Sequence, residues 1–132
     1  MKRFLFVFLV ALLLATVGCN RGIASQKAHS TGAKKDITGA WRGASVVDGV
    51  RLRMVLRFHG EAGGAYAGTF ESPDQHSGQI VMDQVICKNG RVHVEVNGIQ
   101  FALDGALSAN GKQLAGTWSQ RGVSMPITLT RE

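Results

Sequence analysis

Apolar and polar side chains alternate with a period of two along most of the chain after residue 38. The clearest run covers residues 50–59, where valine, leucine, methionine and phenylalanine alternate with arginine and histidine. Such alternation is typical of β-strands that bury one face, because successive side chains of a strand point to opposite sides. Similar runs lie at 91–97, 99–107, 113–119 and 123–130. No segment keeps a helical period for three turns, so the pattern predicts an all-β domain.

Short turn signals separate these runs. Six dipeptides that tolerate a positive φ mark reversals of the chain: Asp48-Gly49, Gly63-Gly64, Asn89-Gly90, Asn97-Gly98, Asn110-Gly111 and Arg121-Gly122. The stretch from Ser72 to Gly78 is the one longer loop. Seven connections imply eight strands, at approximately 39–47, 50–59, 65–72, 79–87, 91–97, 99–107, 113–119 and 123–130.

All these connections are short, so neighbouring strands should pair antiparallel in a plain meander. Eight strands in that order can close on themselves, which leaves no exposed sheet edge. We therefore expect an eight-stranded antiparallel up-and-down meander barrel at residues 38–132. A barrel of this strand number either fills with side chains or holds one small ligand, and the sequence leaves both possibilities open.

The first residues carry the pattern of an export signal. Lys2 and Arg3 form a short positive region, and a nearly unbroken apolar run from Phe4 to Val17 follows. This is the layout of a secretory signal peptide, which we assign to residues 1–18. The alternative is a retained anchor helix, but the run is shorter than the roughly 20 residues that a membrane-spanning helix needs.

Residues 16–19 resemble the lipobox of bacterial lipoproteins, in which a cysteine is acylated and becomes the new N-terminus. Thr16 departs from the pattern, since leucine is commonest there. The resemblance implies lipidation of Cys19. Because Asn20 and no aspartate follows, it also implies an outer-membrane lipoprotein that faces the periplasm. The alternative is ordinary cleavage, for example after Ala24, which would leave no lipid.

The composition of the remaining chain supports a tethered domain. Residues 19–37 would be the lipidated cysteine and a flexible tether rich in Ser, Ala, Gly and Lys. Loss of Lys2 and Arg3 lowers the net charge from +6 to +4, a mild basic bias that does not indicate nucleic-acid binding. With Cys19 acylated, only Cys87 remains, so the fold depends on its apolar core.

Glycine–x–aromatic triplets recur at 39–41, 68–70 and 116–118, and glycine and ring would share one strand face. Residues 38–41 resemble the Gly-x-Trp opening of lipocalin- and avidin-like barrels, and Tyr66 to Phe70 resembles a strand of the avidin type. The resemblance implies that Arg131 covers the Trp41 end of the barrel.

A second resemblance covers roughly residues 39 to 131. It rests on Gly39-x-Trp41-x-Gly43, Leu52 to Leu56, Ser72-Pro73-Asp74-Gln75, Gly116 to Gln120 and Pro126-Ile127-x-Leu129-x-Arg131. These segments are similar to the β domain upstream of some secreted α/β-hydrolases, where the hydrolase domain that follows performs catalysis. The resemblance implies an accessory role.

Catalytic and metal signatures do not stand out in the sequence. Residues 43–47 lack the closing glycine of a nucleophile elbow, and the four histidines lack metal-ligand spacing. We therefore expect no enzyme, no cofactor and no metal site. The lone Cys87, late in a predicted strand, is typical of a small buried apolar residue.

Two sets of residues are candidates for ligand binding. The large residues predicted to face inward are Trp41, Met54, Phe58, Tyr66, Phe70, Phe101 and Trp118. The polar residues of the longest loop are Ser72, Asp74, Gln75 and His76, which equally fit a simple turn-capping role.

Two functions follow as expectations. The first is a non-catalytic envelope lipoprotein that binds a small apolar ligand in or at the mouth of the barrel. The alternative is a protein-binding accessory module, which either partners a separately encoded hydrolase or acts as an envelope inhibitor. Arg51, Arg53 and Arg57 share one strand face, which fits contact with acidic lipid or a protein partner, or simply a solvated surface.

Overall fold

The computed structural model describes residues 35–132, and strands dominate that segment. The strands are β1 (Gly39–Val47), β2 (Val50–Gly60), β3 (Tyr66–Glu71), β4 (Ile80–Val81), β5 (Gln84–Lys88), β6 (Arg91–Val96), β7 (Phe101–Leu107), β8 (Gln113–Gln120) and β9 (Val123–Arg131). Short 3₁₀ turns form η1 (Ala62–Gly64), η2 (Pro73–Gln75) and η3 (Asn97–Ile99). The prediction of an all-β antiparallel meander is confirmed. The expected signal peptide, Cys19 and the tether up to residue 34 lie outside the described residues.

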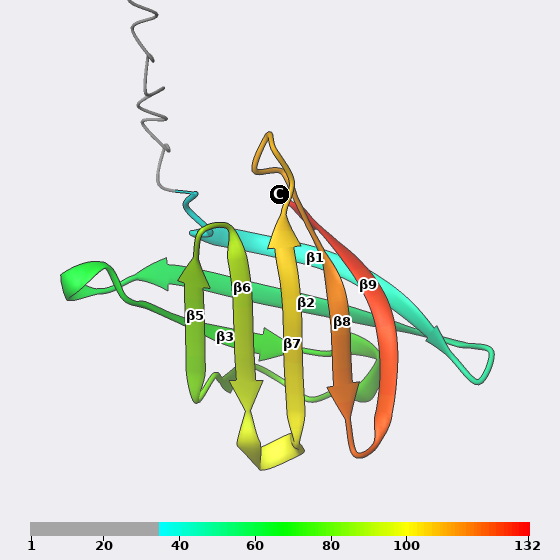
Figure 1. Ribbon diagram of the computed structural model, residues 1–132. Coiled ribbons are helices and arrows are strands. Elements are labelled where there is room, and N and C mark those ends of the chain that lie inside the picture. The colour runs from blue at the N-terminus through cyan, green and yellow to red at the C-terminus, as the bar shows by residue number, and fades with distance from the viewer. Residues whose placement is uncertain (1–34) are drawn as a thin grey trace, which may run out of the picture. The chain divides into compact units, whose positions relative to one another are not determined.

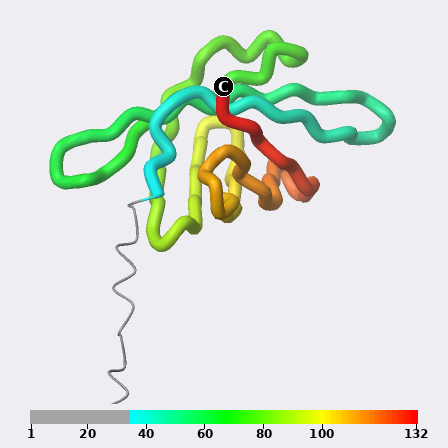
Figure 2. The backbone as a smooth tube through the Cα atoms, turned by 90° about the horizontal axis from the view of Figure 1, so that it is seen from above, coloured from blue at the N-terminus to red at the C-terminus, as the bar shows by residue number. Residues whose placement is uncertain are grey.

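The nine strands form one sheet in the order β4-β3-β2-β1-β9-β8-β7-β6-β5, which curls into a half-barrel. Figure 1 shows β1 to β3 crossing steeply behind β5 to β8, and Figure 2 shows the β1–β2 hairpin and the η1 turn projecting at opposite sides. The first and last strands are neighbours, through the pairs Trp41↔Arg131 and Arg42↔Thr130. Further along, the Ser45 hydroxyl donates to the Pro126 carbonyl at 2.7 Å. Proline has no amide hydrogen for a strand ladder, so this side-chain bond joins β1 and β9 there.

The structure has nine strands where the sequence predicts eight, because the segment 79–87 is split in two. Its first part pairs with β3 and its second part with β6. At the break, the Met82 amide donates to the Gly68 carbonyl and the Asp83 amide donates to the Glu95 carbonyl, both at 2.9 Å. The chain thus passes from one neighbour to the other within two residues, which alternation of apolar residues does not reveal.

Most predicted tight turns are present. Asp48-Gly49, Asn89-Gly90 and Arg121-Gly122 have positive φ at both positions, as two-residue hairpin turns of type I′ require. Asn97-Gly98 does not form such a turn. These residues belong to η3, and Gln100 takes the left-handed conformation instead, with φ of 52°. The following strand therefore begins at Phe101 rather than at residue 99.

The buried core fills the space inside the curl. The ring centroids of Phe70 and Phe101 are 4.6 Å apart, and those of Phe101 and Trp118 are 6.1 Å apart. The fully buried apolar residues belong to one cluster, which includes Ile37, Trp41, Leu56, Phe70, Val94, Leu103, Leu114 and Leu129. Side chains therefore occupy the middle of the molecule.

The curled sheet has two ends, which we name after their tryptophans. At the Trp41 end, Ile37 is fully buried, although the sequence places it in the tether. Its carbonyl accepts the Trp41 Nε1–H at 2.8 Å, and the Arg131 guanidinium lies 4.8 Å from the centroid of the Trp41 ring. This contact agrees with the expectation that Arg131 covers Trp41. The Trp118 end carries the β1–β2 and β8–β9 turns, η3 and the loop after β3.

Candidate functional site

A hollow of about 520 Å³ opens at the Trp118 end of the sheet. This volume lies within the range of about 300–1,000 Å³ that is usual for small-molecule sites. Five apolar residues, three neutral polar residues and one cation line it: Val47, Leu52, Ile99, Trp118, Val123, Gln75, Ser77, Gln120 and Arg121. The lining of the hollow therefore combines apolar and polar side chains.

Four connections bring these residues together. Val47 and Leu52 come from the β1–β2 hairpin, and Ile99 comes from η3. The loop after β3 contributes Gln75 and Ser77, and Val123 comes from the start of β9. In a meander, every second connection lies at the same end of the sheet, so segments far apart in sequence meet there. The Gln120 side-chain amide donates to the Ile99 carbonyl at 3.1 Å, which holds η3 against β8.

Trp118 forms a fixed part of the floor. Its Nε1–H donates to the Ser45 hydroxyl at 2.8 Å, and that hydroxyl donates to the Pro126 carbonyl at 2.7 Å. Both side chains are nearly inaccessible to solvent. The chain of bonds satisfies the buried indole N–H and fixes the ring orientation, because an unpaired buried donor costs about 1–3 kcal/mol.

The polar loop of residues 72–78 contributes to the hollow through Gln75 and Ser77. Ser72 is buried, its amide donates to the Ser77 hydroxyl at 2.8 Å, and its own hydroxyl has no hydrogen-bond partner within the described part of the chain. His76 is exposed and left-handed, with φ of 53° and its amide bonded to the Pro73 carbonyl. His76 thus serves the turn.

Asp74 has a structural partner in β2. Its carboxylate accepts the Arg53 amide at 2.7 Å and the Arg53 guanidinium at 2.6 Å. These hydrogen bonds to Arg53 lower the pKa of Asp74 to about 2. The carboxylate therefore stays ionised and attaches the loop to the edge of β2 beyond the end of β3. Of the four loop candidates, only Gln75 lines the hollow.

Most of the inward candidates lie in the core rather than at the hollow. Met54, Phe58, Phe70 and Phe101 are buried members of the core cluster, and Trp41 lies at the opposite end. Tyr66 is half-buried, and its hydroxyl donates to the Asp36 carboxylate at 3.3 Å. Burial, followed by the Asp36 charge, raises the pKa of Tyr66. Trp118 is the one inward candidate among the residues that line the hollow.

A second hollow of about 400 Å³ lies on the outer face of β1, β2 and β9. Its lining residues are Arg42, Gly43, Ala44, Arg51, Arg53, Met54, Val55, Pro73, Thr128 and Thr130. The arginine stripe predicted on β2 is mostly paired: Arg53 binds Asp74, and Arg57 binds Glu71 at 2.8 Å. Arg51 makes no salt bridge with any residue that the structure describes.

His93 lies between two carboxylates on the outer face of β6 and β7. Its Nε2 is 3.0 Å from Glu95 and its Nδ1 is 2.6 Å from Asp104. Hydrogen bonds to Glu95 and then Asp104 raise the pKa of His93. Both ring nitrogens are engaged, so the cluster links two strands. Among residues 35–132, no group of three or more His, Cys, Asp or Glu residues has an arrangement that could hold a metal ion.

Several residues that line the hollow were missed by the sequence reasoning. Val47, Leu52, Ile99, Arg121 and Val123 are ordinary strand-end or turn residues in the sequence. The available signal was the alternation of connections, since those at 48–49, 72–78, 97–98 and 121–122 must share one end of a meander. Combining that rule with the apolar residues near each turn would have found Val47, Leu52, Ile99 and Val123, whereas Arg121 belongs to a turn itself.

Comparison with known proteins gives no further identification. The chain matches no protein-family model and no curated protein sequence. Within the described segment, no helix has the length and apolar character needed to span a bilayer. The site is therefore interpreted from its own geometry.

Proposed function

We propose that the domain is a non-catalytic binding module that holds a small, largely apolar molecule in the hollow at the Trp118 end. The observation that supports this proposal is the lining of the hollow, which combines five apolar residues with three neutral polar residues and one cation. Burial of apolar ligand surface would supply the affinity, and the polar residues would orient the polar end of the ligand.

The mouth is a better position for the ligand than the interior. The rings of Phe70, Phe101 and Trp118 already contact one another across the core, and Ile37 is buried at the other end. We also propose that the domain is of the lipocalin- and avidin-like barrel type, which residues 38–41 resemble. In this proposal the ligand lies at the open end of the barrel rather than in its interior.

We also propose that the chain is exported and that Cys19 carries a lipid, which would place the domain at the outer membrane facing the periplasm. Lys35 lies near Gly90 at the Trp41 end, so the hollow lies at the far end of the domain from the point where the chain enters it. Metabolic labelling with a radioactive fatty acid should mark the wild type and should not mark a Cys19→Ser variant. Equal labelling of the two proteins, or an unlabelled wild type, would contradict lipid anchoring.

Native mass spectrometry of residues 20–132, produced in the periplasm and purified gently, tests ligand binding. We expect a discrete added mass that disappears on denaturation. Val123→Asp should abolish the added mass, because it introduces a charge into the apolar lining. Ile86→Asp is the matched control, since Ile86 is also an exposed strand residue but does not line the hollow. A clean apo mass that fatty acids and similar amphiphiles leave unchanged would refute the proposal.

The second candidate function is a protein-binding accessory module, possible partners being a separately encoded hydrolase or an enzyme that it inhibits. The second hollow, on the outer face of β1, β2 and β9, favours this candidate because it places arginines around a recess. Specific and saturable binding of a purified hydrolase by the domain would support it. An accessory role also agrees with the proposal of a non-catalytic domain. In that proposal, Asp74 has a structural role, because its carboxylate binds Arg53 and holds the loop against β2.

A further inference from the structure

The outer face of β1 is recessed at Ala44, beside longer side chains of β1 and β2. β1 contributes Arg42 and the small Ala44 to this face, whereas β2 contributes Arg51 and Arg53. A methyl group on Gly43 would lie 2.6 Å from the Thr128 carbonyl oxygen, so β1 and β9 approach closely at this point. The resulting recess follows the strands, and we call it the outer groove.

The outer groove continues across the sheet. A neighbouring hollow of about 420 Å³ shares Ala44 and Thr128 with it. The other residues of that hollow are Ala115, Gly116, Pro126 and Ile127, which are small or apolar. One end of the outer face is therefore lined with arginines, and the other end is smooth and uncharged.

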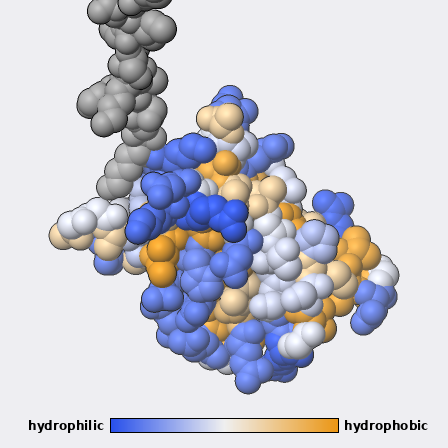
Figure 3. All heavy atoms as spheres, viewed as in Figure 1, coloured by the Kyte–Doolittle hydropathy of each residue, from blue (hydrophilic) through white to orange (hydrophobic). Residues whose placement is uncertain are grey.

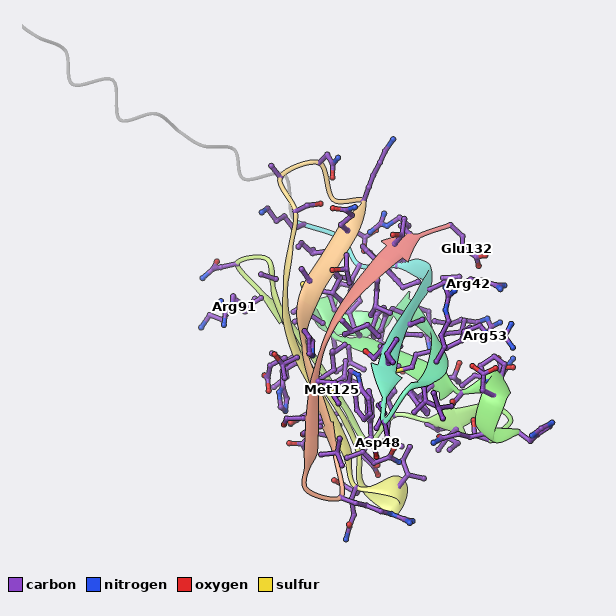
Figure 4. All side chains as sticks on the ribbon, turned by 90° about the vertical axis from the view of Figure 1, so that its right-hand side faces the viewer. Arg42, Asp48, Arg53, Arg91, Met125 and Glu132 are labelled. Carbon is purple, nitrogen blue, oxygen red and sulfur yellow. The ribbon has the colours of Figure 1, made fainter. Side chains whose placement is uncertain are left out.

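Carboxylates of the chain itself already bind two of the three arginines. The Arg42 Nε is 2.5 Å from a Glu132 carboxylate oxygen, and Arg53 binds Asp74 through its Nε and Nη2. Figure 4 shows Arg42, Arg53 and Glu132 on the same side of the molecule, with Arg91 on the opposite side. Each guanidinium has five N–H donors, so both keep donors for another acceptor.

We infer that the outer groove binds an extended, acidic segment of a partner protein. This inference rests on the second candidate function, the accessory role, and is independent of the ligand hollow. Arg51 and Arg53 are two residues apart on one strand face, which corresponds to a spacing of about 7 Å. An extended peptide with acidic residues at alternate positions presents carboxylates at the same spacing. Arg42, on β1 beside Ala44, binds a further carboxylate when Glu132 moves away.

An extended peptide fits this site better than a membrane surface does. Ala44 and Val55, which is only 4% exposed, lie among the longer side chains of the arginines that line the groove. A flat bilayer cannot enter such a recess, whereas a single extended chain can. Thr128 and Thr130 on the other wall offer hydroxyls to the peptide backbone.

Fluorescence anisotropy with a labelled peptide that alternates glutamate and serine tests the inference. Arg51→Gln should weaken binding by about two- to fivefold, the usual effect of one partly exposed ion pair. Glu132→Gln should strengthen binding by a similar factor, because it releases Arg42. All measurements use the full domain at fixed salt, and thermal melting shows that each variant is folded.

Two matched controls separate the groove from general electrostatics. Arg91→Gln removes the same charge on the opposite side, and Glu71→Gln releases Arg57, which does not line the groove. Both should leave binding unchanged. Equal effects of Glu132→Gln and Glu71→Gln would overturn the inference. The inference would also be overturned if a peptide of the same composition, with its glutamates in one block, bound equally well. Binding of phosphatidylglycerol vesicles that depends on Arg51 would overturn it too. Failure of ligand binding at the Trp118 end would not affect these outcomes.

Discussion

At the residue scale, the glycines of the glycine–x–aromatic triplets have different roles. A methyl group on Gly68 would lie 2.3 Å from the Arg57 carbonyl oxygen and 3.1 Å from the Phe58 ring and the Met82 sulfur, so backbone and large side chains both approach this glycine. At Gly116 the obstacle is also backbone, whereas at Gly39 nothing lies within 4 Å and the φ of 118° is the special feature. A shared sequence pattern therefore covers two physical causes, close approach of a paired strand and an unusual φ.

Gly116 should be the most sensitive of these positions. An added methyl group would lie 2.0 Å from the Asp104 carbonyl oxygen and 2.5 Å from the Gly105 Cα on the paired strand β7. Gly116→Ala must therefore push β7 and β8 apart, and we expect a loss of about 1–3 kcal/mol in the free energy of unfolding. Urea denaturation measures this loss.

Gly98→Ala is the control for that substitution. Nothing lies within 4 Å of its added methyl group, so its effect should stay within about 0.5 kcal/mol. Equal stability of the two variants would contradict the close approach of β7 and β8 at Gly116.

At the element scale, His93 links β6 and β7 through Glu95 and Asp104. Because the folded-state pKa of His93 is raised, its stabilising effect is complete below the unfolded pKa of about 6.5. The effect is lost as the pH rises through the folded pKa. We expect the free energy of unfolding to fall as the pH rises from about 6.5 through the folded-state pKa of His93, and the fall should be modest because the cluster is partly exposed.

His93→Gln tests this pH dependence. The variant has no imidazole to titrate, so its free energy of unfolding should fall less than that of the wild type over the same pH range. His59→Gln is the control, because His59 is exposed and makes no salt bridge with the described residues. An identical pH profile for the wild type and His93→Gln would contradict the assigned role of the cluster.

The elements themselves were largely predictable from local patterns. Period-two alternation located most strands, and hairpins such as Asn89-Gly90 followed from turn chemistry. Asn97-Gly98 was wrongly predicted to form a two-residue turn. The left-handed residue is Gln100 instead, and its backbone N–H donates a hydrogen bond to the Asn97 carbonyl. The break at Met82 and Asp83 arises because one residue bonds to β3 and the next bonds to β6. The local sequence does not show which strands lie beside a segment, so the break could not be predicted.

At the scale of the whole molecule, the two tryptophans mark ends with different properties. The sequence predicted that both would face inward, and the barrel resemblance implied that Arg131 covers Trp41. It did not predict that Ile37 is buried there or that Trp118 lines an open hollow. Figure 3 shows orange apolar surface toward the β1–β2 hairpin, where Val46 and Val50 are exposed. Which end stays open depends on the residues before the first strand, and these carry no periodic pattern.

The closed end gives the final prediction, which concerns the boundary of the domain. Ile37 is fully buried although it precedes β1, so Ile37→Ala should lower the free energy of unfolding by about 2–5 kcal/mol, as for other large core truncations. Val81→Ala is the control, because Val81 is 73% exposed and its truncation should cost less than about 0.5 kcal/mol. Urea denaturation of both variants decides the matter. If Ile37→Ala is as stable as Val81→Ala, the residues before Thr38 are only a tether. A large difference makes them the closure of the Trp41 end, which leaves the Trp118 end as the open one.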